Sequence, residues 1–340
     1  MSILTTAIRL FSIVLLFVAS AFARGEQASA ALFNGRAMMH AHNAYPEKGQ
    51  WGDRINRALA TGATPIVIEQ DVALAGQGAS ARTVVSHDDE LTGSEPTLES
   101  HFFDRVRPLM ERALAERRQD RWPLVVLHLD FKTNQAAHHR AVLALLQKYR
   151  GWLMTANRGA DPNQLMPLNP GPLLVLTESG ENQEADFFTT QQAGQPLLIF
   201  GSVPNADVFR VEDAEQRARA LAAAAPDALI PSPATNYRRW VNFPWQVVEQ
   251  GGPRQAGDWS AADRTRLAAI VNRAHSQGLG IRFYTLNGHD PSTHPEWTAS
   301  YNFGSLDAVR ARWLAAIAAG VDLIATDQYE ELATLISRPR

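Results

Sequence analysis

The sequence predicts a (β/α)8 TIM barrel, a ring of eight parallel strands with helices outside it, and one β-hairpin added after the second barrel strand. Two observations favour this fold. Short apolar, strand-like runs alternate with longer amphipathic runs along the chain, which is the pattern of parallel strands joined by crossover helices. Eight such strand-like runs occur, and eight parallel strands close a barrel. An open, doubly wound sheet is the alternative.

Each predicted barrel strand is a short apolar run. They are Ala37–His42, Pro65–Asp71, Pro123–Asp130, Leu173–Glu178, Leu197–Gly201, Ala228–Ser232, Ile281–Asn287 and Leu323–Asp327. The predicted helices have apolar residues at helical spacing. They are Arg54–Ala60, Thr97–Arg118, Gln135–Tyr149, Ala214–Ala224, Ala261–Gln277 and Leu306–Ala319.

Two further segments complete the predicted organisation. The strand-like run Arg82–His87 follows Asp71 after a gap that contains Ala75-Gly76-Gln77-Gly78. That gap has turn signals and barely reaches the minimum length of a crossover, so we expect a hairpin return beside the second barrel strand. The segment Tyr237–Asp258 is rich in Trp, Gly and Pro, and we expect it to form a long loop over the barrel mouth.

The N-terminal residues predict an export signal. Arg9 precedes an apolar run that ends in Ala21-Phe22-Ala23, the pattern of a signal-peptide cleavage site. This run is shorter than the roughly 20 apolar residues that span a bilayer. We therefore expect residues 1–23 to be a signal peptide and residues 24–340 to form a single domain. The mature protein would be exported, periplasmic or secreted, with no stable membrane span.

Composition limits the chemistry of the chain. It has no cysteine, so thiolate catalysis is excluded and a metal must be held by oxygen or imidazole. The net charge is −3, and side chains of both signs are interspersed. No basic cluster indicates a nucleic-acid-binding face. The sequence leaves the oligomeric state open.

Acidic side chains gather at the predicted carboxyl ends of the strands, where barrel enzymes have their active sites. Glu69 and Asp71 end the second strand, and Asp130 ends the third. Because side chains alternate along a strand, Glu69 and Asp71 point the same way. Three neighbouring carboxylates repel one another unless a cation lies between them. We therefore predict that they hold one divalent cation, Mg²⁺ or Ca²⁺, which prefer oxygen ligands.

Two histidines complete the predicted site. His42 ends the first strand and His87 ends the hairpin run. A histidine titrates near neutral pH, so this pair could act as acid and base in one reaction. Cleavage of a phosphodiester needs such a pair and positive charge on the phosphate oxygens, which the cation and Lys132 could supply. Asn43 and Lys132 are the expected substrate-binding residues.

Four segments, taken in order, resemble the motifs H-R, E-x-D-V, V-x-H-D and acid-x-K of glycerophosphodiester phosphodiesterases. They are His42, Ile68–Val72, Val84–Asp88 and Leu129–Lys132, and the segments Phe283–Asn287 and Gly320–Asp327 look like the last two strands of that family. Asn43 stands where that family has Arg. The segment His40–Tyr45 is closer to the H-x-H-N-D-Y opening of the wider PLC-like phosphodiesterases, with Ala44 in place of Asp.

This resemblance to the PLC-like phosphodiesterase superfamily implies a metal-dependent phosphoric diester hydrolase of lipid metabolism. The expected substrate is a glycerophosphodiester or another small-molecule or lipid-headgroup phosphodiester. The resemblance implies that Glu69, Asp71 and Asp130 hold the cation, while His42 and His87 are acid and base. It does not say which histidine has which role, or which diester is cleaved.

Three alternatives stay open. A metal-dependent amidohydrolase would use His40, His42 and Asp327 as ligands, although later predicted strands lack the histidines of that class. A glycoside hydrolase would use two carboxylates, such as Asp130 and Glu178. A non-catalytic barrel would bind phosphorylated headgroups, because a fold does not fix a function.

Overall fold

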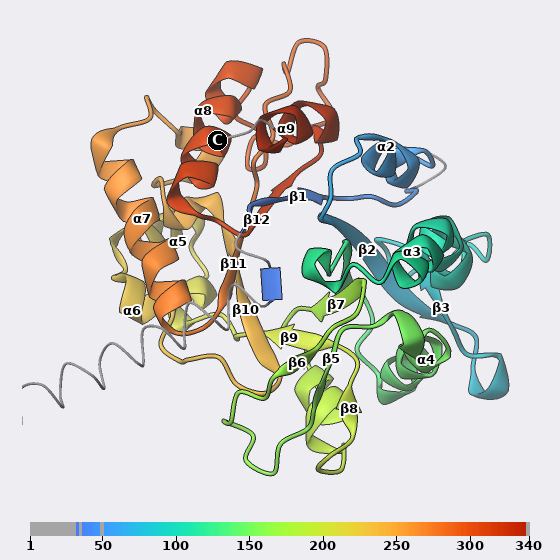
Figure 1. Cartoon of the computed structure of the whole chain (residues 1–340). Helices are drawn as coiled ribbons and strands as arrows, with labels where there is room; N and C mark the ends of the chain where they lie inside the picture. The colour runs from blue at the N-terminus through green and yellow to red at the C-terminus, as the bar shows by residue number, and fades with distance from the viewer. Residues whose placement is uncertain (1–31, 34–35, 48–50, 338–340) are drawn as a thin grey trace, which may run out of the picture.

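The computed structural model describes residues 32–33, 36–47 and 51–337 of the chain. Eight parallel strands close into a barrel, so the predicted fold is confirmed (Figure 1). The ring closes because β1 pairs with both its sequence neighbour β2 and the last strand β12. In chain order the barrel strands are β1 (Met38–Ala41), β2 (Ile66–Ala75), β4 (Val125–Phe131), β7 (Leu173–Thr177), β9 (Phe200–Ser202), β10 (Arg238–Pro244), β11 (Gly280–Tyr284) and β12 (Leu323–Thr326).

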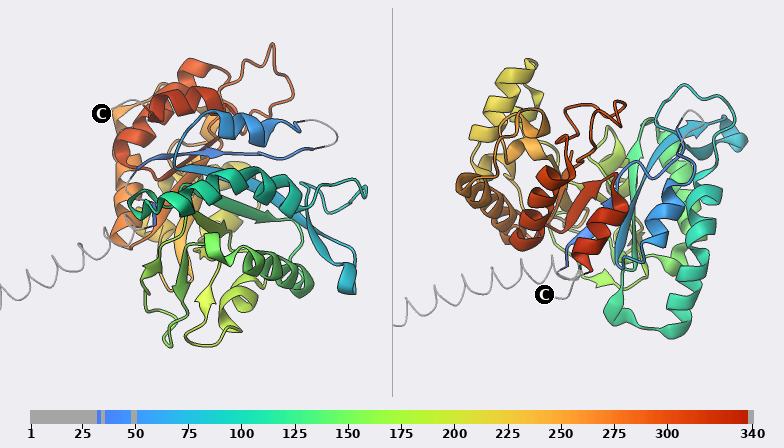
Figure 2. Two further views of the ribbon diagram at one scale, coloured as in Figure 1. Left: turned by 45° about the vertical axis from the view of Figure 1, so that its right-hand side comes forward. Right: turned by 90° about the horizontal axis from the view of Figure 1, so that it is seen from above.

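Helices surround the ring, as the views along and across the barrel show (Figures 1 and 2). Their ends follow ordinary capping rules. The side chain of Ser260 accepts a hydrogen bond from Asp263 N at the start of α7, and Gly320 (φ 83°) ends α8 in the left-handed conformation. The helices are α2 (Arg54–Ala60), α3 (Asp104–Glu116), α4 (Ala136–Lys148), α5 (Ala214–Ala223), α6 (Pro226–Leu229), α7 (Ala261–Ser276), α8 (Leu306–Ala319) and α9 (Tyr329–Ile336).

The predicted hairpin is confirmed. Strand β2 continues past the ring to Ala75 and pairs in antiparallel fashion with β3 (Arg82–Val85). Gly76 begins the turn with φ 77°, and a Cβ there would lie 2.5 Å from the carbonyl oxygen of Ser80. The hairpin projects from the barrel in Figure 2 and brings the end of β3 back toward the mouth.

One predicted strand and one predicted loop are wrong. The segment Ala228–Ser232 is no strand, because Pro226 starts the short helix α6 there. The barrel strand is instead β10, which lies within the predicted loop Tyr237–Asp258. Its sequence is not an apolar run, since Arg238, Arg239 and Asn242 belong to it. The run Leu197–Gly201 divides between β9 and β8 (Pro196–Leu197).

Strand β8 belongs to a second, smaller sheet. It pairs in antiparallel fashion with β5 (Thr155–Asn157), which pairs on its other edge with β6 (Leu168–Asn169).

At the amino ends of the barrel strands, Phe33 is fully buried. A Cβ at Gly280 would lie only 1.7 Å from Phe33 Cε2. Glycine is therefore needed at this position for the phenyl ring of Phe33 to pack over the start of β11.

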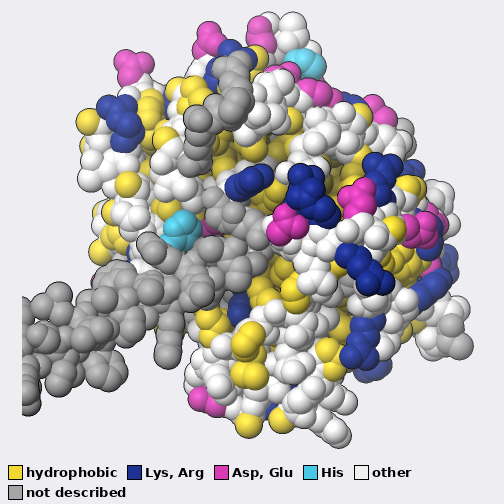
Figure 3. All heavy atoms as spheres, in the orientation of Figure 1, with side chains coloured by type: hydrophobic (Ala, Val, Ile, Leu, Met, Phe, Trp, Pro, Cys, Tyr) yellow, Lys and Arg dark blue, Asp and Glu magenta, His cyan; other side chains and the backbone are white. Residues whose placement is uncertain are grey.

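The predicted signal peptide lies outside the described residues. Among the residues described, no helix has the length and apolar character that crossing a membrane requires. On the face drawn in Figure 3, Lys and Arg side chains lie among Asp and Glu side chains.

Candidate functional site

The structure brings all seven predicted site residues together. They line one cavity of about 330 Å³ at the carboxyl ends of the strands: His42, Asn43, Glu69, Asp71, His87, Asp130 and Lys132. This is the end of the barrel where the fold places active sites.

The three acids form a group that could hold a metal ion. Glu69, Asp71 and Asp130 each offer a carboxylate oxygen, and these oxygens lie within 4.8 Å of one another. The parallel pairing of β2 with β4 places Asp71 directly beside Asp130. Burial, and then the neighbouring charge of Asp130, raise the pKa of Asp71 to about 7. A divalent cation fits this set, because its charge would offset the burial and the repulsion by Asp130 that raise the pKa of Asp71.

Lys132 neutralises part of this acidic group. Its Nζ lies 2.8 Å from Asp71 Oδ2 and 2.8 Å from Asp130 Oδ2. Burial lowers the pKa of Lys132, but Asp71 and Asp130 outweigh it, and the net shift is upward. Lys132 is therefore a charged partner of the acids in this structure, and its predicted contact with substrate stays a prediction.

A second group of possible metal ligands lies deeper in the barrel, formed by His40, Glu69 and His128. Arg282 Nε donates to His40 Nδ1 at 2.9 Å. Because an arginine only donates, His40 Nδ1 accepts, and the ring proton is on Nε2. His40 would have to lose that proton before Nε2 could bind a metal. The all-oxygen group is therefore the better metal site, and it favours a hard cation.

His42 is held in a fixed orientation. Its Nδ1 lies 3.0 Å from Asp327 Oδ2, and a carboxylate only accepts, so Nδ1 carries a proton. Nε2 then faces the acids, 3.6 Å from Glu69 Oε2. Burial lowers the pKa of His42, but Glu69 and then Asp327 outweigh it, and the net shift is upward. Nε2 is thus the atom that can exchange a proton with a bound molecule.

Asn43 connects the parts of the site. It has φ 52°, a conformation that asparagine tolerates better than most residues. Its backbone N–H donates to Glu69 Oε2 at 3.2 Å, and its Nδ2 donates to Asp327 Oδ1 at 3.0 Å. Tyr45 Oη donates to Asn43 Oδ1 at 2.7 Å. These bonds position Glu69 and Asp327, while a contact of Asn43 with substrate stays a prediction.

His87 lies at the rim of the cavity. Its side chain is 49% exposed, against 13% for His42. The ring is stacked against Tyr45 with 6.4 Å between ring centroids, and Nδ1 is 3.6 Å from Asp88 Oδ1. The two predicted acid–base residues therefore differ, since His42 is partly buried and held in orientation, whereas His87 is solvent-accessible.

Sequence reasoning missed Arg282, the central cation of the barrel interior. It is 1% exposed and donates to Glu69 Oε1 at 3.0 Å and to Asn242 Oδ1 at 2.8 Å. Burial raises the pKa of Glu69, but Arg282 and then His42 outweigh it and hold the pKa well below its usual value. The available signal was an arginine between Ile281 and Phe283 in a predicted barrel strand.

Two further residues of this network were not assigned a role. His128 Nδ1 lies 3.2 Å from Glu69 Oε1, and its Nε2 lies 3.5 Å from Glu178 Oε1. Burial lowers the pKa of His128, but Glu178 and Glu69 outweigh it, and the net shift is upward. Arg54 Nη1 donates to Asp327 Oδ1 at 2.8 Å, so the partner of His42 is itself held by a cation.

No family model matches the chain, and no curated protein matches it. Dihydropteroate synthase from Burkholderia cenocepacia, complexed with 7,8-dihydropteroate, is a similar solved structure. It has 17% identity and a TM-score of 0.33, over 89% of each chain. Plasmodium falciparum HPPK-DHPS A437G with pteroate has 9% identity and a TM-score of 0.43, over 88% of this chain and 47% of that one. The chain thus spans about half the length of that protein.

A GH5-4 broad specificity endoglucanase from an uncultured bacterium is also similar, with 12% identity and a TM-score of 0.31 over 90% of this chain and 94% of that one. At these identities and scores, none of the three likenesses assigns an activity or a ligand to this chain. The prediction of a phosphodiesterase is corrected: no family model supports a PLC-like assignment, and no phosphodiesterase is among the similar structures named. The physical reason for the error is that short motifs predict a cluster of residues more reliably than they predict its substrate.

Proposed function

We propose that this chain is an enzyme that binds one divalent cation, Mg²⁺ or Ca²⁺, and performs acid–base chemistry on a small polar molecule at the barrel mouth. The observation that supports it most is the trio of Glu69, Asp71 and Asp130, with carboxylate oxygens within 4.8 Å of one another. The same cavity contains His42, whose ring is oriented by Asp327. A cation site beside an oriented histidine suits catalysis.

Three side chains of the site have a definable task in this proposal. His42 Nε2 gives or takes the proton, since Nδ1 donates to Asp327. His87, at the rim, could exchange a second proton with solvent. Lys132 balances the acids and could move to a negatively charged group of the bound molecule. A bound divalent cation would supply positive charge where negative charge develops on a substrate oxygen.

The geometry does not favour the amidohydrolase alternative. Of its expected ligands, His40 has its Nδ1 bound by Arg282. Asp327 accepts hydrogen bonds from Arg54 and from Asn287 Nδ2, the latter at 2.7 Å. These cations and amides already occupy the atoms that a metal would need.

The first test is cation binding. Protein treated with EDTA and then dialysed would be titrated calorimetrically with Mg²⁺, Ca²⁺, Mn²⁺ and Zn²⁺. We expect one site that prefers a hard cation, with affinity at least about tenfold weaker in Asp130→Asn. Asp207→Asn is the matched control, because Asp207 is 97% exposed and lies outside the cavity. Absence of any cation binding by the wild-type protein would overturn the metal site and leave Lys132 as the resident counter-charge.

The second test is turnover. The cation-loaded protein would be incubated with a mixture of polar metabolites, and consumption would be followed by mass spectrometry. The proposal expects at least one metabolite to be consumed in reactions with wild-type protein and not with His42→Gln or with EDTA. Consumption that His42→Gln leaves unchanged would remove His42 from the chemistry.

A further inference from the structure

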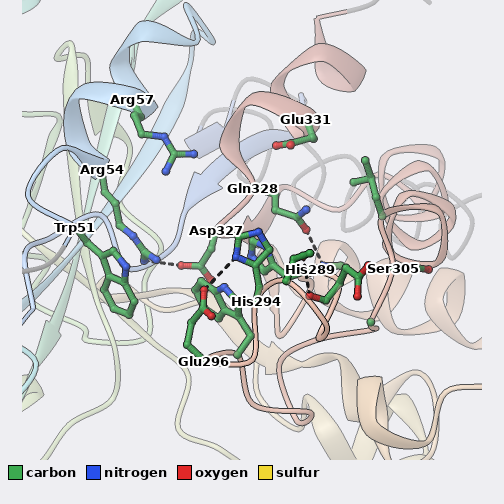
Figure 4. A pocket seen from close by; sticks show the side chains of 16 residues that line it. Trp51, Arg54, Arg57, His289, His294, Glu296, Ser305, Asp327, Gln328 and Glu331 are labelled. Atoms are coloured by element: carbon green, nitrogen blue, oxygen red, sulfur yellow. Dashed lines mark hydrogen bonds and ion pairs between the residues drawn. The ribbon is translucent and has the colours of Figure 1, made fainter.

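A second, larger cavity adjoins the site. It has a volume of about 620 Å³ and is shown in Figure 4. Its wall is formed mainly by the loop of residues 285–305 between β11 and α8, with contributions from the starts of α2 and α9. Loops longer than roughly 12–15 residues are uncommon in compact domains and are often functional. Backbone hydrogen bonds from Asn287 N to Tyr301 O and from Phe303 N to Asn287 O close this loop on itself.

A pair of tryptophans separates the two cavities. Trp51 and Trp297 line both of them, and their rings are parallel within 8° with centroids 6.1 Å apart. Trp51 has φ 61°, which is strained for a bulky side chain and persists only where the surrounding structure enforces it. This backbone conformation places the Trp51 ring at the boundary between the cavities.

The tryptophan pair is connected to the mouth site through Arg54. The guanidinium carbon of Arg54 lies 3.8 Å from the centre of the Trp51 ring and 5.4 Å from that of Trp297. Arg54 Nη1 donates to Asp327 Oδ1 and to the carbonyl oxygen of Asn43. A molecule that contacts Trp51 and Trp297 would thus lie next to the residues that hold His42.

The charges that line the second cavity are of both signs and are largely paired. Arg57 donates to both carboxylate oxygens of Glu330, and His294 lies 3.1 Å from Glu296 Oε1. Glu331 and Asp290 add acceptors to the same wall. Four carboxylates and two arginines line this cavity, which disfavours an anionic ligand. Five of these six groups already have a polar or charged partner within the protein, which disfavours a cation that would need free carboxylates. A hydroxyl group donates one hydrogen bond and accepts two, so a ligand with several hydroxyls matches such a mixed wall.

We infer that the second cavity binds a neutral, polyhydroxylated group, a sugar or polyol, as the part of the substrate that extends from the mouth past Trp51 and Trp297. This inference rests on the proposed function. The volume lies within the roughly 300–1,000 Å³ of small-molecule sites. The aromatic rings would contact the apolar C–H face of the group, and the polar side chains around them would bind its hydroxyls.

The test uses neutral glucose, galactose, xylose and sorbitol, with cationic glucosamine and anionic gluconate as charged counterparts. Binding would be measured by saturation-transfer NMR and calorimetry. We expect saturable binding of at least one neutral probe, about tenfold weaker in Trp297→Ala and also weaker in Glu331→Gln. Glu111→Gln is the matched control, since Glu111 is an exposed helical glutamate on α3. It is expected to bind like wild type.

Three results would overturn the inference. They are the absence of binding by every neutral probe, binding that Trp297→Ala leaves unchanged, and a preference for glucosamine or gluconate over all neutral probes. Cation titration and thermal melting of the same samples separate this inference from the proposed function. A Trp297→Ala protein that binds cation normally but no sugar has kept its fold and its mouth site. Sugar binding by a wild-type protein that binds no cation would refute the proposed function alone.

Discussion

Replacement of Arg282 by methionine tests the polar interior of the barrel. Methionine has similar length and no charge, so Arg282→Met removes the bonds to Glu69 and His40 without leaving a large cavity. Glu69 then stays buried at 3% exposure with only histidines as charge partners. Removing one partner of a buried ion pair costs about 3–5 kcal/mol in proteins. We expect a loss of that size in the free energy of unfolding at neutral pH.

The loss should depend on pH in a defined direction. The pKa of Glu69 is well below its ordinary value in the folded protein, so its carboxylate stabilises the fold above the unfolded pKa of about 4.5. That contribution disappears as pH falls through the lower folded pKa. In Arg282→Met the folded pKa of Glu69 rises, and protonation then relieves the unpaired charge. The difference between variant and wild type should therefore shrink as pH falls from 7 toward about 4.

The assay is urea denaturation followed by circular dichroism, at several pH values between these limits. Arg112→Met is the control, because Arg112 is an exposed arginine on α3, and a change within about 0.5 kcal/mol is expected there. An Arg282→Met protein as stable as the control would refute the role of Arg282 as the counter-charge of Glu69. A loss that is the same at both ends of the pH range would refute the electrostatic cause.

Three further predictions follow from single contacts. Burial and the charge of Asp130 raise the pKa of Asp71 to about 7. Ionisation of Asp71 therefore lowers the stability of the folded protein as pH rises through that value. In EDTA, Asp71→Asn should raise the melting temperature more at pH 8 than at pH 5. Gly280→Ala should cost about 1–3 kcal/mol by overpacking against Phe33, and the same change in a Phe33→Ala background should cost less in denaturant unfolding. Ser260→Ala should cost about 1 kcal/mol by removing the cap of α7, measured by thermal melting.

The barrel could be predicted because its strands are mostly uniform apolar runs between helical patterns. Helices α2 and α8 were placed at their observed bounds. Strand β10 could not be placed in this way. Its Asn242 side chain points into the barrel, where it contacts Glu178 and Arg282, so polarity there reflects partners on other strands. A sequence pattern measures local apolar spacing and does not report a partner 40 or 64 residues away.

For the site, the sequence likewise predicted where residues gather but not which partners they have. Residues at the carboxyl ends of strands were correctly expected to converge, because the strands of a parallel barrel all end at one rim. The partners that determine their chemistry were not foreseen as such. Arg282 reaches His40 across 242 positions of sequence, and Asp327 reaches His42 across 285. These distant contacts set the tautomer of His40 and the orientation of His42.

The charges of the mouth and interior help explain why the pKa values of two histidines and one aspartate are raised there. Five carboxylates face three side chains that are always positive, and these are Glu69, Asp71, Asp130, Glu178 and Asp327 against Arg54, Lys132 and Arg282. The network lacks two positive charges. The pKa values of His42, His128 and Asp71 are all raised, so each of these groups holds a proton more firmly than in water. A divalent cation at the carboxylates would supply the same two charges and release those protons, which couples cation binding to the protonation state of His42.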